Sequence, residues 1–474
     1  MVPGSAISPH PPAGAPMAKI EFTLNGEPVR AEFDPPTRTV LDWLRESRGL
    51  TGTKEGCNEG DCGACTITVS YLRGGELRRE AVNSCILFLP QLHGKAVRTI
   101  EGVRGPGDEI HPVQTEMVRH HGSQCGFCTP GIVMSLVAAH SNGEQRHDDV
   151  LAGNLCRCTG YAPIFRAAEQ AALVPPPQWM AEEEFPAGNG NARIPEDLDS
   201  FAAWYEANPG ARLVAGATDV GLWVTKGMQD LPPVCFIGQL LELDFVRRAD
   251  GWIEIGALVS INRLYRRMRG AHPGFAELLR RFGSVQVRNS ATIGGNIANG
   301  SPIGDAAPAL IALGAELVLR RGGERRQLAL ENFFIEYGKQ DRRDGEFIEC
   351  IRFPVQPDRL RCYKLSKRFD QDISAVCGCL AIDVSDGLVV RARLAFGGMA
   401  GIPMRAAGAE AVLTGSPWNK TSIGAAMQAL RDDFVPISDA RASAGYRLNV
   451  AQNMLLKYFQ EDTRPDEPSS VLEI

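Results

Sequence analysis

The stretch that decides the fold is Cys57-Asn-Glu-Gly-Asp-Cys62-Gly-Ala-Cys65, followed further along by Asn83-Ser-Cys85. Its C-x4-C-x2-C…C spacing is that of a plant-type [2Fe–2S] site, in which each of two irons takes two thiolates from the protein. Gly56, Gly60 and Gly63 suit a loop that wraps closely around an inorganic core and points N–H groups at sulfur. Zinc is the alternative, although zinc knuckles usually show paired C-x2-C hooks rather than this wide first gap.

A second quartet of cysteines consists of Cys125 and Cys128, in C-G-F-C, and Cys156 and Cys158, in C-R-C. Helical apolar periodicity follows each pair, over 131–140 after Pro130 and over 162–173. Helix N-termini would place partial positive charge beside these thiolates. Alone, this quartet leaves zinc and iron–sulfur open. Because this quartet lies downstream of the first site, iron–sulfur is favoured over zinc here, since two clusters in series can pass electrons from one to the other.

Composition bounds the class of protein. The 474 residues suggest about three domains, and 44% hydrophobic residues argue against a disordered chain. A net charge of −6 without a strongly basic region argues against nucleic acid as the main partner. No apolar run is long enough to span a bilayer.

The start, 1–18, is rich in Pro, Gly and Ala and lacks the features of a secretory signal. We interpret it as a leader, with Met17 as an alternative start. Clustered cysteines without a secretory signal indicate metal ligation in a cytoplasmic protein rather than disulfides. The remaining cysteines are expected to be reduced core residues; they are Cys235, Cys350, Cys362, Cys377 and Cys379.

The chain divides into successive regions. Residues 18–98 hold a hairpin with an Asn25-Gly26 turn, a short helix from Thr39, the cysteine loop and further strands, which together predict a small β-grasp domain. Residues 99–174 form the helical cysteine region. Pro175-Pro-Pro177 opens a linker over 175–193, whose triple acid at 182–184 is expected to be solvated. Two further regions are expected over 194–357 and 358–470.

Two glycine-containing loops mark the third region. An apolar strand runs into a polar loop over Arg212–Asp219, and a second loop over 290–299 continues to Asp305, before an apolar helix. Such loops can offer N–H groups to a diphosphate, although a tight turn is the alternative. Neither matches G-x-G-x-x-G, and no P-loop motif occurs.

The last region alternates between strands and helices. Strands are expected over 374–383 and 389–396, joined through Asp386-Gly387, with helices near 406–413 and 423–434. The polar tail beyond Glu461 is expected to be loose.

These motifs resemble those of the molybdenum hydroxylases. The pairing of C-x4-C-x2-C with C-G-F-C-T-P-G and L-C-R-C-T-G-Y is specific to that family, and T-I-G-G-N-I with S-P-I-G-D is typical of its FAD domain. Over about 18–460 the order is similar to that of the small iron–sulfur and FAD subunit of bacterial xanthine dehydrogenases. The resemblance implies a multidomain α+β fold. It consists of a ferredoxin-like β-grasp [2Fe–2S] domain, a four-helix-bundle [2Fe–2S] domain, and an α+β FAD-binding domain of the vanillyl-alcohol-oxidase (PCMH) type with a C-terminal α+β subdomain.

The resemblance also implies site residues. Both quartets would ligate clusters, namely Cys57, Cys62, Cys65 and Cys85, then Cys125, Cys128, Cys156 and Cys158. FAD would contact Leu213, Val214, Ala215, Gly216, Ala217, Thr218, Asp219, Val220, Phe282, Val287, Thr292, Gly295, Asn296, Asp305, Ile348 and Lys364. Phe282 would lie against the flavin ring, with core packing as its alternative, and Lys364 near the flavin edge, with an exposed strand-end charge as its alternative. Asp372 would lie near the flavin and NAD+, Tyr337 would lie near NAD+, and Gln124 would approach a molybdenum pterin.

The function implied is electron transfer. Electrons would pass from a molybdenum pterin on a large partner chain through the second and then the first quartet to FAD and NAD+, during oxidation of hypoxanthine and xanthine to urate. No region here resembles the molybdenum-binding portion, so a partner is expected, in a dimer of heterodimers. The alternatives are another molybdenum hydroxylase, acting on an aldehyde, an N-heterocycle or an aryl thioester, and a non-enzymatic zinc scaffold.

Overall fold

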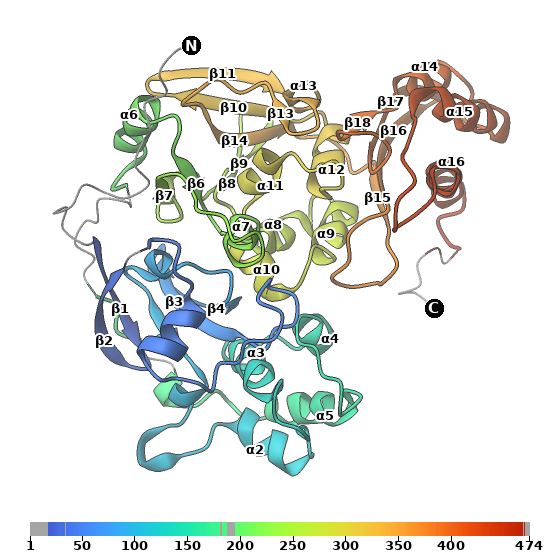
Figure 1. Ribbon diagram of the computed structural model, residues 1–474. Helices are drawn as coiled ribbons and strands as arrows, with labels where there is room; N and C mark the ends of the chain where they lie inside the picture. The colour runs from blue at the N-terminus through green and yellow to red at the C-terminus, as the bar shows by residue number, and fades with distance from the viewer. Residues whose placement is uncertain (1–17, 34, 181–182, 187–194, 468, 470–474) are drawn as a thin grey trace. The chain divides into compact units, whose positions relative to one another are not determined.

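The computed structural model describes residues 18–33, 35–180, 183–186, 195–467 and 469 (Figure 1). The expected leader with Met17, part of the linker and the end of the tail lie outside the described residues. The chain forms two compact units. The first contains residues up to 201 with 208–240 and 283–291, and the second contains 202–207, 241–282 and the chain from 292 onward.

A β-grasp domain opens the first unit, as the sequence predicts. Asn25 and Gly26 have φ of 53° and 88°, and such positive values suit a two-residue hairpin turn. A short helix continues into a π-helical turn, in which Trp43 packs edge-on against Phe22. The elements are β1 (Ala18–Leu24), β2 (Glu27–Phe33), α1 (Val40–Asp42), η1 (Trp43–Ser47), β3 (Thr66–Arg73), β4 (Glu76–Asn83), η2 (Leu89–Leu92) and β5 (Ala96–Arg98), and the strand order is β2-β1-β5-β3-β4.

Four helices follow, in agreement with the predicted helical cysteine region. They are α2 (Pro112–Arg119), α3 (Thr129–Ser141), α4 (His147–Leu151) and α5 (Ala162–Ala171), with short 3-10 turns η3 (Ile100–Gly102), η4 (Pro106–Asp108) and η5 (Gln178–Met180) beside them. Pro130 stands in the first turn of α3, where its missing N–H costs nothing. Ile132, Val137 and Ile164 are fully buried in the shared core.

One residue of the linker's triple acid, Glu183, is not solvated as the sequence suggested, whereas Glu184 is exposed as expected. Glu183 lies with its side chain 2% exposed and accepts hydrogen bonds from Arg79 at 2.9 Å and from Arg98 at 2.8 Å. The next residue, Glu184, accepts from the Thr23 hydroxyl through its carbonyl at 2.6 Å. Two guanidinium groups therefore draw this segment onto the β-grasp sheet, and Glu182 lies outside the described residues.

Segments from beyond the linker complete the first unit. The strands β6 (Arg212–Val214) and β7 (Val234–Phe236) pair in parallel, and α7 (Val220–Thr225) and α10 (Val285–Ser290) accompany them. Val214 and Phe236 share a core with Phe88 of the β-grasp domain, and the two phenylalanine rings meet edge to face at 6.4 Å. This part of the chain thus packs against the iron–sulfur region rather than apart from it.

The second unit contains a five-stranded sheet with the order β11-β10-β14-β9-β8. The expected loop over 290–299 is largely helical. Thr292 caps α11 by accepting from the N–H of Gly295 at 3.1 Å, a capping interaction that the sequence reasoning did not weigh. The elements are α6 (Leu198–Ala207, begun in the first unit), η6 (Leu241–Leu243), β8 (Val246–Ala249), β9 (Trp252–Gly256), α8 (Ile261–Met268), α9 (Pro273–Arg280), α11 (Ile293–Asn299), α12 (Ala306–Ala312), β10 (Glu316–Arg321), β11 (Glu324–Ala329), α13 (Leu330–Phe333), β12 (Phe334–Glu336), β13 (Lys339–Gln340) and β14 (Phe347–Pro354).

A C-terminal α+β subdomain ends the second unit. Its antiparallel sheet has the order β15-β16-β17-β18, with β15 (Leu360–Leu365), β16 (Val376–Ser385), β17 (Leu388–Gly397) and β18 (Met404–Arg405). The helices α14 (Ala407–Leu413) and α15 (Lys420–Asp433) agree with expectation, whereas α16 (Ala444–Thr463) was not predicted. Figure 1 shows these three helices gathered beside that sheet, and Phe396, Leu430 and Leu455 share their core.

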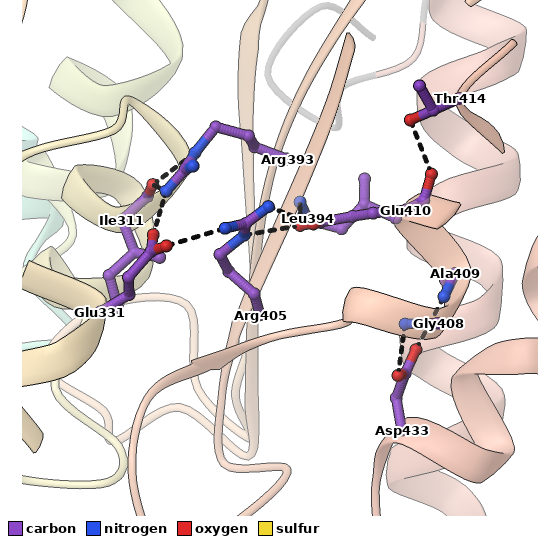
Figure 2. A network of polar contacts seen from close by, with 10 residues as sticks. All are labelled: Ile311, Glu331, Arg393, Leu394, Arg405, Gly408, Ala409, Glu410, Thr414 and Asp433. Atoms are coloured by element: carbon purple, nitrogen blue, oxygen red, sulfur yellow. Dashed lines mark hydrogen bonds and ion pairs between the residues drawn. The ribbon is translucent and has the colours of Figure 1, made fainter. Parts of the chain in front are cut away.

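A polar network fastens this subdomain to the five-stranded part of the same unit (Figure 2). Glu331 of α13 accepts from Arg405 at 2.8 Å and pairs with Arg393 of β17. Arg393 also donates to the carbonyl of Ile311 in α12 at 2.7 Å. Glu410 of α14 pairs with Arg405 and accepts from the N–H of Leu394 at 2.7 Å. Arg405 therefore bridges an acidic group on each side of the junction, and Arg393 adds a second link to α12 and α13.

Candidate functional site

The first cysteine quartet converges, as the spacing predicts. The N–H of Cys62 and of Asp61 point at the sulfur of Cys57 at 3.3 and 3.4 Å, and the N–H of Cys57 points at the sulfur of Cys62 at 3.3 Å. Hydrogen bonds with Cys62 and then Cys85 lower the pKa of Cys57, while the bond with Cys57 raises the pKa of both partners. Close, coupled thiols with N–H groups aimed at sulfur are what a [2Fe–2S] unit requires.

The segment that carries Cys85 is tied to the same loop. The side-chain amide of Asn83 donates to the carbonyl of Gly60 at 2.8 Å, and the Ser84 hydroxyl donates to the carbonyl of Cys65 at 2.7 Å. A Cβ on Gly56 would stand 2.7 Å from the sulfur of Cys62. The loop is therefore a tight cradle in which the residues present fit an inorganic core.

The second quartet lines one open cavity of about 150 Å³, bounded by residues 124–128 and 155–158. Cys128 stands directly before α3, as expected, whereas Cys158 lies four residues before the start of α5. Burial and then Cys156 raise the pKa of Cys128 to about 12. Burial raises the pKa of the Cys156 thiol, but hydrogen bonds from Thr159 outweigh burial and lower that pKa below its usual range. Cys125 and Cys158 are exposed, so this site opens to solvent.

Tyr161 orders the segment that enters the second quartet. Its hydroxyl accepts from the N–H of Cys156 at 2.8 Å and donates to the carbonyl of Asn154 at 3.2 Å. No group of three or more His, Cys, Asp or Glu side chains among the described residues is arranged to hold a single metal ion. A [2Fe–2S] unit instead takes its four thiolates as two pairs, one on each iron.

The first predicted flavin loop lies in the first unit, together with Val287. Ala217 has a φ of 59°, and a Cβ on Gly216 would stand 1.8 Å from the carbonyl oxygen of Ser290. Within the described chain, the N–H groups of Gly216, Ala217 and Thr218 donate to no acceptor. Such a turn leaves N–H groups available to an anion, so its residues fit a diphosphate.

The helix α7, which follows this loop, packs directly on the first cysteine quartet. Leu222 shares a small core with Cys65, Cys85 and Ile86. A Cβ on Gly221 would stand 2.8 Å from the carbonyl oxygen of Ile86, the residue after Cys85. The loop expected to bind flavin and the loop expected to bind iron are therefore immediate neighbours.

The second predicted flavin loop lies in the second unit, where it adjoins a buried ion pair. Lys364 donates to Asp305 at 2.6 Å with side chains 3% and 7% exposed, and the Ser374 hydroxyl donates to the same carboxylate at 2.5 Å. Lys364 is thus not an exposed strand-end charge. Asn296 has a buried side-chain oxygen without a partner in the described chain, and an unpaired buried acceptor suits a polar ligand.

The remaining predicted residues are scattered over the second unit and the helical region. Phe282 is half-buried, and Ile348 is buried in β14. Tyr337 is 77% exposed between β12 and β13. Asp372 accepts from the N–H of Arg368 at 2.8 Å. Gln124 is exposed at the rim of the second quartet.

No described helix combines the length and apolar character needed to cross a membrane. All thirteen cysteines are free. Of the five expected in the core, Cys235, Cys350, Cys377 and Cys379 are buried, whereas Cys362 is only half-buried.

Comparison with known families divides the chain into four. Residues 22–89 match the 2Fe-2S iron-sulfur cluster binding domain and 99–169 the [2Fe-2S] binding domain. Residues 189–356 match the FAD binding domain in molybdopterin dehydrogenase, and 361–462 the CO dehydrogenase flavoprotein C-terminal domain. These matches confirm the multidomain fold, two [2Fe–2S]-binding domains and an FAD-binding domain, and the zinc alternative is not retained.

The chain is also similar to several known proteins. The chain is 31% identical over 525 residues to a xanthine dehydrogenase of Emericella nidulans, covering 93% of this chain and 38% of that protein. It therefore spans under half the length of that relative. A carbon monoxide dehydrogenase from Hydrogenophaga pseudoflava is 27% identical, with a TM-score of 0.53 over 56% of this chain and 93% of that one. Quinoline 2-oxidoreductase from Pseudomonas putida 86, 22% identical with a TM-score of 0.52 over 56% and 96%, shares the fold.

Proposed function

We propose that this chain, which is the iron–sulfur and flavin portion of a molybdenum hydroxylase, is the electron-transfer subunit of a xanthine dehydrogenase. It would serve the oxidation of hypoxanthine and xanthine to urate, with NAD+ as acceptor. A large partner chain would carry the molybdenum pterin. When bound, the two clusters carry single electrons, and FAD exchanges a hydride with the nicotinamide.

The order of transfer rests on one observation. The quartet of Cys57, Cys62, Cys65 and Cys85 adjoins the loop over 213–220 through α7 and Ile86, whereas Cys125 and Cys158 of the other quartet are exposed at an open cavity. This supports an order in which the exposed quartet would receive electrons from a partner and the quartet beside α7 would pass them to flavin. Gln124 at the cavity rim would meet the partner first.

The chain's own residues prepare these sites. N–H groups aimed at Cys57 and Cys62 favour thiolate over thiol and set the cluster potential. The free N–H groups of Gly216, Ala217 and Thr218 would bind the FAD diphosphate. Lys364, paired with Asp305, would bring a fixed charge towards the flavin.

The test is to purify the chain with its co-expressed partner and measure iron, FAD and molybdenum together with xanthine-dependent NAD+ reduction. Cys156→Ala should remove one cluster signal and stop that reduction while the second cluster signal and FAD remain. Full turnover by this variant would refute the proposed path.

A second candidate is another molybdenum hydroxylase. The likeness to a carbon monoxide dehydrogenase over 56% of this chain supports it, because the substrate is chosen outside this chain. A screen of the assembled enzyme against xanthine, aldehydes, N-heterocycles, aryl thioesters and carbon monoxide separates the two, since activity confined to one of the others would exclude the xanthine assignment.

A further inference from the structure

Four buried polar side chains from distant parts of the sequence meet beside the two cysteine quartets. Thr66 follows Cys65, Asn154 precedes Cys156 by two residues, Ser135 belongs to α3, and Gln286 belongs to α10. Each is at most 2% exposed. Gln286 comes from the segment that matches the FAD-binding family, so its burial here joins two regions that sequence matching keeps apart.

Gln286 and Ser135 are the donors that meet at Asn154, since the Ser135 hydroxyl also donates to the Asn154 side-chain oxygen, at 2.7 Å. The Gln286 side-chain nitrogen lies 3.0 Å from the Asn154 side-chain oxygen, 3.0 Å from the Ser135 hydroxyl and 3.3 Å from the Thr66 hydroxyl. Asn154 in turn donates to the carbonyl of Gly63 at 3.1 Å, inside the first cysteine loop. Apart from the Gln286 side-chain oxygen, which has no partner in the described chain, these side chains satisfy one another, and a buried polar set of this kind is rigid.

Three glycines allow the backbones to close around these side chains. A Cβ on Gly63 would stand 2.1 Å from the carbonyl oxygen of Gly153, and a Cβ on Gly131 would stand 2.2 Å from that of Gly63. A Cβ on Gly153 would stand 2.1 Å from the side-chain oxygen of Gln286. The two cysteine loops are therefore in direct backbone contact at this point, and Gln286 closes the contact.

The contact includes a short connection between the two quartets. The N–H of Leu155 donates to the carbonyl of Cys62 at 3.0 Å, and Leu155 is covalently joined to Cys156. A residue of one quartet is thus linked to a residue of the other by a single hydrogen bond and one intervening residue. Asn154, on the other side of Leu155, is held by Gln286 and by the Tyr161 hydroxyl.

We propose that Gln286 is a positioning residue for electron exchange between the two clusters. Together with Ser135 it holds Asn154 and thereby the hydrogen bond from Leu155 to Cys62, and this crossing is the proposed route of exchange. One electron given up by one cluster is taken up by the other, so no further reactant is required. The inference rests on the proposed electron-relay role and names the residue within it that sets the coupling.

The test is Gln286→Met in the full chain, because methionine keeps the length of the side chain and removes its donor. The clusters are reduced with dithionite, which needs neither substrate, partner nor NAD+. We expect iron and FAD contents and both cluster signals to stay at their original levels. The magnetic splitting between the two reduced clusters should decrease, and equilibration of an electron between them after flash reduction should slow.

Gln452→Met is the matched control, because Gln452 is also a buried glutamine but lies in α16 and donates to the carbonyl of Met427. It should keep the splitting and the equilibration rate. If Gln286→Met fails to assemble, Ser135→Ala removes an acceptor for Gln286 and a donor to Asn154 with little loss of volume, and it should likewise weaken the splitting.

Unchanged splitting and rate in the assembled Gln286 variant, or in Ser135→Ala if that is the variant that assembles, would overturn the inference. An equal loss in the Gln452 variant would overturn it too. The proposed function fails separately, if the unsubstituted chain with its partner shows two coupled clusters but transfers no electrons from any substrate.

Discussion

Replacing Glu183 by Gln tests the buried ion pairs that hold the linker. The side chain is 2% exposed and faces Arg79 and Arg98, whose side chains are 5% and 10% exposed. Burial lowers the pKa of Arg79, and the carboxylate of Glu183 opposes that shift. Removing the carboxylate's charge leaves two guanidinium groups facing each other out of water. Breaking a buried pair by deleting one partner costs about 3–5 kcal/mol.

Because a chain of several domains with bound cofactors does not unfold in two states, the assay is native-state hydrogen exchange. The amides of β4 and β5, which carry Arg79 and Arg98, report the local opening free energy. A loss of about 3 kcal/mol corresponds to exchange faster by roughly 100-fold, at about 1.4 kcal/mol for each factor of ten.

Glu32→Gln supplies the control, because Glu32 pairs with Lys19 at 2.7 Å with both side chains exposed. Exposed pairs contribute about 0–1 kcal/mol, so exchange in the β-grasp sheet should change little. Exchange in the Glu183 variant no faster than in this control would refute the reasoning and return the linker to the solvated state that its sequence suggests.

Further predictions concern the flavin loops and acid stability. Gly216→Ala should lower FAD content at unchanged iron content, measured by absorbance and metal analysis, because its Cβ would stand 1.8 Å from the carbonyl oxygen of Ser290. Lys364→Met should destabilise the second unit by about 3–5 kcal/mol, since it leaves the buried Asp305 uncompensated; hydrogen exchange in β15 and α12 measures this, and unchanged exchange would contradict it. Burial, aided by neighbouring positive charge, lowers the pKa of His111 to about 3. In this pH range the unfolded chain therefore binds a proton at His111 that the native chain does not bind. The free energy of unfolding falls as pH falls from about 6.5 towards 3, by up to about 1.4 kcal/mol per pH unit. His111→Asn, which retains a helix-capping acceptor, should flatten this acid dependence in exchange measured from pH 7 to 5.

Local patterns made the first half of the fold predictable. Cysteine spacing and the Asn25-Gly26 turn each act over a few residues, so the chain carries their signals without reference to distant partners. The helices after each cysteine pair follow from apolar periodicity in the same way. Phe282 and Tyr337, by contrast, rest on resemblance alone and stay predictions.

Long-range partners account for what the sequence did not reveal. Glu183 reads as a solvated linker acid until Arg79 and Arg98, about a hundred residues away in the sequence, are seen beside it. Gln286 likewise meets Asn154 and Thr66 across more than one hundred residues. A single sequence carries no local signal for such pairings. The helix α16 has only a weak apolar stripe. Its buried Arg447 donates to the carbonyls of Ala375 and Gly398, which lie directly before β16 and directly after β17.

The interleaving of the chain bears on any attempt to divide it. Severing the polypeptide in the proline-led linker would leave Val214 and Phe236 without Phe88, against which they pack. In the later fragment, Asn289 of α10 would also lose its hydrogen bond to the carbonyl of Ala81 in β4, which is 2.9 Å long. Such a fragment would expose apolar surface and would aggregate unless the earlier fragment were supplied with it. The parts of the chain before and after the linker are therefore expected to be stable only when they are present together.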